Sequence, residues 1–183
     1  MKKVMDEMKI QKICSSILRH SVVAVLVLFF VFFTLISSGE AEVQADRILV
    51  EKSKRKMTLY QGDKTLKTYR IALGKNPAGH KVRKGDEKTP VGKYYIDYRN
   101  PDSRFHLSLH ISYPNDRDIM RSMKRDVTPG GDIMIHGLNK ETEWLEEYHR
   151  FIDWTDGCIA VTNREIEEIW DLVPDGTPVI IRP

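Results

Sequence analysis

From Asp46 onward, the chain is a succession of short strand-like segments separated by turn-forming residues. The first three segments are RILVEK (47–52), KMTLYQ (56–61) and TLKTYRIALG (65–74), with SKRK and QGDK between them. Short runs rich in β-branched and aromatic residues between such turns are typical of strands. The sequence therefore predicts a β-meander. A loop rich in Gly, Pro and charge (75–88) follows, and VGKYYIDYR (91–99) resumes the strand pattern.

Two later segments place histidines on strands. FHLSLHIS (105–112) alternates strictly, so one face is apolar and the other carries His106, Ser108, His110 and Ser112. The apolar face is expected in the core. The polar face either meets water or lines a cleft, and two histidines alone do not decide between these. A further strand, DIMIHG (132–137), ends with His136 beside Gly137.

Helical signals occupy two segments. ETEWLEEYHRF (141–151) has the composition of a short exposed helix, and His149 within it is interpreted as a solvated residue, with a lid role as the alternative. Thr162 and Glu165 match a capping box that opens a helix with Ile166, Ile169, Trp170 and Val173 on one face. PVIIR (178–182) closes the chain as a strand. We expect one globular domain, mainly β with two or three short helices.

The first 45 residues have the layout of an export signal. Five basic residues precede an apolar run of 15 residues (22–36), and Val43-Gln44-Ala45 fits the small-x-small cleavage pattern. The run is shorter than the roughly 20 residues that span a bilayer comfortably. This favours a cleaved signal peptide; the unusually long basic region keeps an uncleaved inner-membrane anchor as the alternative. Either way, residues 46–183 are expected in the periplasm or cell envelope, and contact the membrane only through this segment.

Charge and cysteine content limit the function classes further. The exported part holds 24 Lys/Arg against 22 Asp/Glu, so no nucleic-acid partner is implied. Cys14 precedes the apolar run and would stay behind or be removed, which leaves Cys158 alone in the exported part. In an oxidising compartment an unpaired cysteine suggests a reactive thiol or an intermolecular bridge, whereas a small buried hydrophobe is the plain alternative. One cysteine and scattered histidines offer no metal-ligand spacing, and no cofactor is implied.

A nucleophilic cysteine needs a base, and His136 is the best candidate. It lies at a strand end next to a glycine, where a side chain and a backbone carbonyl can both face a cleft. Consecutive amides of Asp156, Gly157 and Cys158 could stabilise an oxyanion, and the helix near Thr162 could add a weak positive field. A Cys and a His at this separation are also compatible with a buried thiol and a satisfied core histidine.

Four ordered blocks make the pattern more specific: GDEKTPVGKYY (85–95), HISYPN (110–115), MIHGL (134–138) and WTDGCIAVTN (154–163). Together they resemble the L,D-transpeptidase catalytic domain of the YkuD type, over residues 46–183. The resemblance implies a β-sandwich of curved mixed sheets and a role in cell-wall biogenesis, acting on peptidoglycan stem peptides. A cysteine thiolate would attack the diaminopimelate carbonyl of a tetrapeptide, release D-Ala and form an acyl-enzyme. The acyl group would then pass to an amine of a second stem peptide, a lipoprotein lysine or a D-amino acid.

Carried onto this chain, the resemblance makes Cys158 the nucleophile, His136 the general acid/base and the Gly137 carbonyl the group that orients the imidazole. The amides of Asp156, Gly157 and Cys158 would form the oxyanion hole. Tyr113, Thr155 and His110 are the weaker substrate-binding candidates, with structural packing an equal alternative for Tyr113.

The chain departs from the family signature at two positions. The motif is usually [ST]-H-G-C followed two residues later by Arg or Asn, and here these positions hold Asp156 and Ala160. Asp156 is expected to oppose a thiolate, and the missing Arg or Asn affects recognition of a substrate carboxylate. The basic run around His80 (75–84) is either a solvated loop or a basic lip of the cleft. The alternatives to a transpeptidase are an L,D-carboxypeptidase or amidase and a murein-binding module whose active site has decayed.

Overall fold

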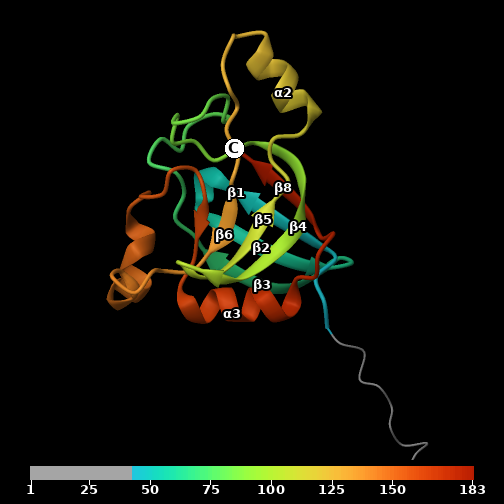
Figure 1. Cartoon of the computed structure of the whole chain (residues 1–183). Coiled ribbons are helices and arrows are strands. Elements are labelled where there is room, and N and C mark those ends of the chain that lie inside the picture. Colours follow the sequence, from blue (N-terminus) through green and yellow to red (C-terminus); the bar gives the residue numbers. More distant parts are fainter. Residues whose placement is uncertain (1–42) are drawn as a thin grey trace, which may run out of the picture. The chain divides into compact units, whose positions relative to one another are not determined.

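The computed structural model describes residues 43–183, which build one curled, mixed sheet of eight strands in the order β3-β2-β1-β8-β4-β5-β6-β7 (Figure 1). The strands are β1 (Arg47–Glu51), β2 (Lys56–Gln61), β3 (Lys64–Arg70), β4 (Gly92–Ser103), β5 (His106–Ile111), β6 (Met134–His136), β7 (Ile159–Ala160) and β8 (Pro178–Arg182). The helical elements are η1 (Lys52–Lys54), α2 (Asp116–Met123), η2 (Glu143–Phe151) and α3 (Asn163–Leu172). The prediction of a mainly β fold with curved mixed sheets is confirmed.

The predicted meander is formed by β1, β2 and β3, which pair antiparallel in chain order. The C-terminal strand β8 inserts between β1, with which it runs parallel, and β4, with which it runs antiparallel. The sheet also closes on itself, because Ala72 and Ala160 exchange backbone hydrogen bonds of 3.0 and 2.9 Å between the segment after β3 and β7. Two edge segments of the sheet are thus bonded to each other.

The two halves of the curled sheet share one core. The apolar face expected for FHLSLHIS is confirmed, since Leu109 and Ile111 are fully buried. They join Ile48 and Leu59 from the opposite half in a single cluster. This burial of branched aliphatic side chains supplies the main driving force for the fold.

The helix α3 covers the sheet beside β5 and β6, as Figure 1 shows. Its predicted capping box is present: the Glu165 amide donates to Thr162 Oγ1 at 3.2 Å and the Thr162 amide donates to Glu165 Oε2 at 2.9 Å. Ile166 and Ile169 are fully buried, so the predicted apolar face is the packed one.

Two helical elements differ from the sequence-based expectation. The helix α2, which stands away from the sheet at one end in Figure 1, was not predicted, although Asn115 and Asp118 form a capping box at its start. The predicted exposed helix 141–151 is instead the 3-10 element η2, interrupted at Glu146, whose φ is 41°. The predicted signal segment lies outside the described residues, apart from its last three positions. Among residues 43–183 no helix is both long and apolar enough to cross a bilayer.

Candidate active site

The outer face of the sheet gathers the polar residues of three neighbouring strands. In the register of β5, β6 and β7, Ser108 lies opposite His136, and His136 lies opposite Ala160. Residues directly opposite each other share a face, so Ser108, His136 and Ala160 lie on one face of the sheet. Leu109 and Ile135, which alternate with them, point to the other face. Ser108 is buried at 2% exposure. The sequence left open whether the polar face of FHLSLHIS meets water or lines a cleft. At Ser108 this face is covered and does not meet water.

His136 is held in a defined orientation and tautomer. Its Nδ1 lies 2.7 Å from the carbonyl oxygen of Gly137, and since a carbonyl only accepts, Nδ1 carries the proton and Nε2 is the basic nitrogen. The ring packs against Phe105, at 4.4 Å between centroids, and edge-on against Trp154 at 5.8 Å. Burial lowers the pKa of His136 to about 4, although the bond to Gly137 acts in the opposite direction. The side chain is therefore neutral at physiological pH.

Cys158 lies immediately before β7 and shares the outer face with His136. Because His136 pairs with Ala160, and side chains two residues apart on an extended strand point the same way, Cys158 is diagonal to the histidine. Its Sγ accepts the Met134 amide at 3.4 Å and donates to the Asp132 carbonyl at 3.4 Å. The thiol is half-buried. Burial raises its pKa, and the carboxylates of Asp156 and Asp132 add to this, while the Met134 amide lowers it.

The turn that carries the thiol is fixed by Thr155. Its Oγ1 donates to the Cys158 carbonyl at 2.8 Å and accepts the Gly157 amide at 3.1 Å. Gly157 has a φ of +133°, and a Cβ there would lie 2.8 Å from the Lys88 carbonyl oxygen. Only glycine fits this turn. Because the Gly157 amide already donates to Thr155, the amides of Asp156 and Cys158 are left as oxyanion-hole candidates.

The Asp156 side chain is exposed, and the Lys75 ammonium lies 2.8 Å from its carboxylate. The expectation that Asp156 opposes a thiolate agrees with its effect on the pKa of Cys158. Lys75 comes from the loop 75–88, so this part of the predicted basic run does face the turn that carries the thiol. Lys81, in contrast, is buried and pairs with Asp86 at 2.9 Å, which fits neither a solvated loop nor a basic lip.

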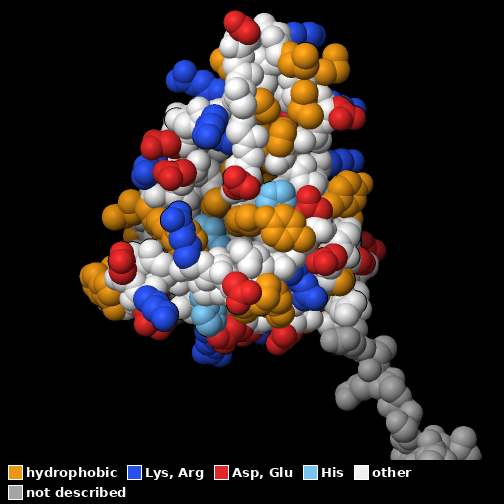
Figure 2. Space-filling view, in the orientation of Figure 1, with side chains coloured by type: hydrophobic (Ala, Val, Ile, Leu, Met, Phe, Trp, Pro, Cys, Tyr) orange, Lys and Arg blue, Asp and Glu red, His pale blue; other side chains and the backbone are white. Residues whose placement is uncertain are grey.

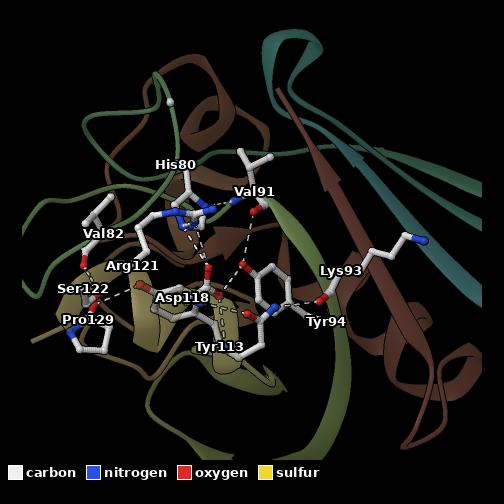
Figure 3. A network of polar contacts seen from close by, with 12 residues as sticks. His80, Val82, Val91, Lys93, Tyr94, Tyr113, Asp118, Arg121, Ser122 and Pro129 are labelled. Carbon is white, nitrogen blue, oxygen red and sulfur yellow. Dashed lines mark hydrogen bonds and ion pairs between the residues drawn. The ribbon is translucent and has the colours of Figure 1, made fainter. Parts of the chain in front are cut away.

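The loop 75–88 is anchored to α2 by a buried polar network, drawn in Figure 3. His80 Nδ1 accepts the Val91 amide at 3.0 Å, so the neutral ring donates through Nε2 to Asp118, 3.1 Å away. The Tyr94 hydroxyl donates to the same carboxylate at 2.9 Å, and Arg121 approaches it at 3.3 Å. This network fixes the loop 75–88, and the Lys88 carbonyl at the end of this loop lies close to Gly157.

Tyr113 belongs to this structural cluster. It is buried at 3% exposure, its hydroxyl donates to the Pro129 carbonyl at 3.2 Å, and its ring packs edge-on against Tyr94 at 5.9 Å. The sequence left open whether Tyr113 binds substrate or packs in the structure. These contacts describe packing.

The interpretation of His149 as a solvated residue is wrong. It is buried at 3% exposure and lies edge-on to Trp154 at 6.5 Å between centroids. Neither of its ring nitrogens has a hydrogen-bond partner, and the buried Trp154 Nε1 has none either. Burial lowers the pKa of His149 to about 4, and the charges of Arg150 and His136 act in the same direction. The composition of η2 did not reveal this, because the contact depends on how the chain turns between His149 and Trp154.

A cavity lies next to the Phe105 ring that packs on His136, and the surface drawn in Figure 2 is of mixed charge. A cavity of about 740 Å³ opens beside Phe105 and is lined by residues of 103–106, 138–141, Glu143 and Asn163. On the face drawn in Figure 2, basic and acidic side chains alternate rather than forming a patch of one sign. Within the described part of the chain, no three His, Cys, Asp or Glu side chains gather closely enough to bind a metal ion.

Comparison with known proteins gives concordant matches. The model of the YkuD L,D-transpeptidase catalytic domain matches residues 45–181. YafK of Escherichia coli K12, a candidate L,D-transpeptidase, is 31% identical over 132 residues, covering 69% of this chain and 46% of YafK. YkuD of Bacillus licheniformis, a further candidate L,D-transpeptidase, is 29% identical over 142 residues, covering 75% of this chain and 66% of YkuD. The chain thus spans about half the length of YafK and about two thirds of YkuD.

Among solved structures, the helical cell shape determining protein Pgp2 of Campylobacter jejuni superposes with a TM-score of 0.56. It is 25% identical to this chain, and the match covers 79% of this chain and 52% of Pgp2.

Proposed function

The chain belongs to the YkuD family of L,D-transpeptidase catalytic domains, and from this premise we propose that it is a peptidoglycan L,D-transpeptidase whose nucleophile is Cys158. The observation that carries the proposal is the arrangement of one thiol and one tautomer-fixed imidazole on the same face of adjoining strands. The Gly137 carbonyl does for His136 what a carboxylate does in a Ser-His-Asp triad: it fixes the tautomer and stabilises the imidazolium that forms.

The resting site is a neutral pair. The lowered pKa of His136 and the raised pKa of Cys158 both favour thiol and imidazole over thiolate and imidazolium. The thiol therefore loses its proton to His136 Nε2 as it attacks, and not before. Such a site is selective, because the thiolate forms only when a carbonyl is positioned to take its electrons.

In the acylation step, Cys158 Sγ bonds to the diaminopimelate carbonyl carbon of a tetrapeptide stem, and its proton passes to His136. The carbonyl oxygen becomes an oxyanion that the Asp156 and Cys158 amides stabilise. His136 then returns the proton to the nitrogen of the leaving D-Ala as the C–N bond breaks. A thioester remains on Cys158.

An acceptor amine then takes the acyl group. We propose the side-chain amine of a second stem peptide or a lipoprotein lysine as the acceptor, which gives cell-wall crosslinking or protein attachment. The domain acts in the periplasm or cell envelope, to which residues 1–45 direct it as a signal peptide or anchor. Pgp2 determines cell shape in its own organism, and this supports wall remodelling as the process served.

The proposal is tested by incubating the full-length protein with a disaccharide tetrapeptide and following the products by mass spectrometry. We expect crosslinked dimer with loss of D-Ala, no product from Cys158→Ala, and an acyl adduct confined to Cys158 in the wild type. A carbapenem should give a mass shift on the same residue. Circular dichroism of Cys158→Ala should match the wild type, which separates lost chemistry from lost folding.

Other products identify the alternatives. Tripeptide without dimer assigns an L,D-carboxypeptidase. Release of crosslinked fragments from intact peptidoglycan, given as a second substrate, assigns an amidase. Binding without turnover assigns a decayed murein-binding module, for which the exposed Asp156 beside the thiol is the favouring observation. A Cys158→Ala variant as active as the wild type would overturn the mechanism.

A further inference from the structure

A second histidine lies on the same outer face as Cys158. His110 of β5 is directly opposite Met134 of β6, whose amide donates to Cys158 Sγ at 3.4 Å. One strand further, Tyr98 of β4 is opposite His110. These residues form a row across the sheet, with His110 and Cys158 flanking Met134. At about 4.8 Å between strands, the backbones of His110 and Cys158 are roughly 10 Å apart, and the Met134 side chain lies between them on the same face. A group bound over Met134 would have His110 on one side and Cys158 on the other.

His110 is held by a carboxylate and by an aromatic ring. Its Nδ1 lies 2.5 Å from a carboxylate oxygen of Asp97, and its ring stacks on Tyr98 at 4.6 Å with an interplanar angle of 14°. The register of β4 and β5 shifts between Ile96 and Tyr98, so Asp97 is the extra residue of a β-bulge. The bulge turns Tyr98 to the outer face while Ile96 stays in the core, and it brings the carboxylate onto the histidine.

The contact with Asp97 defines the chemistry that His110 can perform. A carboxylate only accepts, so Nδ1–H donates to Asp97 and Nε2 is left as a base. When Nε2 takes a proton, Asp97 stabilises the imidazolium, as the aspartate does in a Ser-His-Asp triad. The site therefore contains two histidines with fixed tautomers, one oriented by a carbonyl and one by a carboxylate.

The acceptor half of a transpeptidation needs more than one proton transfer. An aliphatic amine has a pKa of about 10 and arrives as an ammonium ion, which must lose a proton before it is nucleophilic. His136 is committed to the proton that moves between the attacking nitrogen and the Cys158 sulfur. A second base is therefore needed to deprotonate the stem-peptide ammonium. This base has to lie near the thioester.

We propose that His110, oriented by Asp97, is the general base that deprotonates the acceptor ammonium, an assignment that rests on the transpeptidase function proposed above. The ammonium gives one proton to His110 Nε2 and becomes a neutral amine. Its nitrogen attacks the thioester carbon, and the second proton passes to His136. His136 protonates the Cys158 sulfur as the C–S bond breaks, an amide and a free thiol are formed, and His110 releases its proton to solvent.

The experiment separates the two half-reactions in the full-length protein. His110→Gln and Asp97→Asn are compared with the wild type for acylation by a tetrapeptide donor, followed as the mass of the adduct on Cys158. Transfer is then measured with two acceptors, the stem-peptide amine and hydroxylamine. Hydroxylamine is unprotonated at neutral pH and needs no prior deprotonation.

His106→Gln is the matched control. His106 is on the same strand and also contacts a carboxylate, Glu167 at 2.7 Å, but this contact is with α3 and not with the row of Cys158. We expect His110→Gln to acylate like the wild type and to transfer to the stem-peptide amine about 100-fold more slowly, while transfer to hydroxylamine is retained. Asp97→Asn should show the same pattern with a smaller loss, and His106→Gln should show neither.

Three results would overturn the assignment. Unchanged transfer to the stem-peptide amine in His110→Gln would remove the base role. An equal loss with both acceptors, or a loss of acylation, would assign His110 a structural role. Failure of the proposed function looks different, because the wild type would then form no adduct on Cys158 with the tetrapeptide.

Discussion

The Lys75 ammonium lies 2.8 Å from the Asp156 carboxylate, and this ion pair stands beside the Cys158 thiol. Asp156 occupies the position that usually holds a histidine in the family signature, and it raises the pKa of the thiol. The positive charge of Lys75 therefore offsets part of the effect that the negative charge of Asp156 has on the Cys158 thiol. The pair links thiol reactivity to the loop 75–88.

Removing the carboxylate should make the thiol more acidic. We expect Asp156→Asn to speed alkylation of Cys158 by iodoacetamide about two- to threefold at fixed pH, because an exposed charge acts weakly through solvent. Lys75→Ala should slow it. Rates measured by mass spectrometry across pH give the thiol pKa directly, and Asp116→Asn, on α2, is the control. A slower reaction in Asp156→Asn would contradict the electrostatic role.

An apolar side chain at position 149 should stabilise the fold. His149 is buried with both ring nitrogens unpartnered, and an unsatisfied buried polar group costs about 1–3 kcal/mol. His149→Phe is expected to raise the free energy of unfolding by about 1 kcal/mol in urea titrations at pH 7.5. His106→Phe, at a partly exposed position, should leave it near the wild-type value. A destabilised His149→Phe would mean that the imidazole has a partner in solution.

Acid should destabilise the protein through the buried histidines His136 and His149. The pKa values of His136 and His149 fall from 6.5 to about 4 on folding, so the unfolded state binds more protons between these values. Stability is then complete above pH 6.5 and falls as the pH drops toward 4, by roughly 3 kcal/mol for His136 and by less for His149. Urea midpoints measured from pH 7.5 to 4.5 should show that the advantage of His149→Phe over the wild type grows as the pH falls. A constant difference would exclude this linkage.

A side chain at position 157 should disrupt the turn that carries the thiol. Gly157→Ala places a Cβ 2.8 Å from the Lys88 carbonyl oxygen at a φ of +133°, so we expect loss of the acyl adduct and a destabilisation of more than about 2 kcal/mol. Gly176→Ala also has a positive φ, +85°, with no atom within 4 Å of its Cβ, and should cost about 1 kcal/mol with activity kept. Equal effects of the two substitutions would show that the contact with Lys88 is unimportant.

Local patterns were sufficient to predict much of the fold. Alternation predicted β5 and the burial of Leu109, and the capping box predicted the start of α3 at Thr162. The contact between His136 and Gly137 joins adjacent residues, so it too could be anticipated from the sequence.

The burial that sequence reasoning missed depends on how irregular segments fold back on themselves. His149 is buried beside Trp154 and Lys81 is buried against Asp86, in both cases a residue a little further along an irregular stretch that no regular periodicity describes. The bulge at Asp97 becomes visible only when β4 and β5 are paired. The capping box of α2 at Asn115 was a readable local signal that was overlooked.

The place of β8 in the sheet determines when the chain can complete its fold. Residues 178–182 follow the other seven strands of this sheet in chain order, yet they provide the strand that joins β1 to β4. A polypeptide that grows from its N-terminus therefore holds β1 and β4 without the strand between them until β8 has been made. The native sheet cannot close before that point.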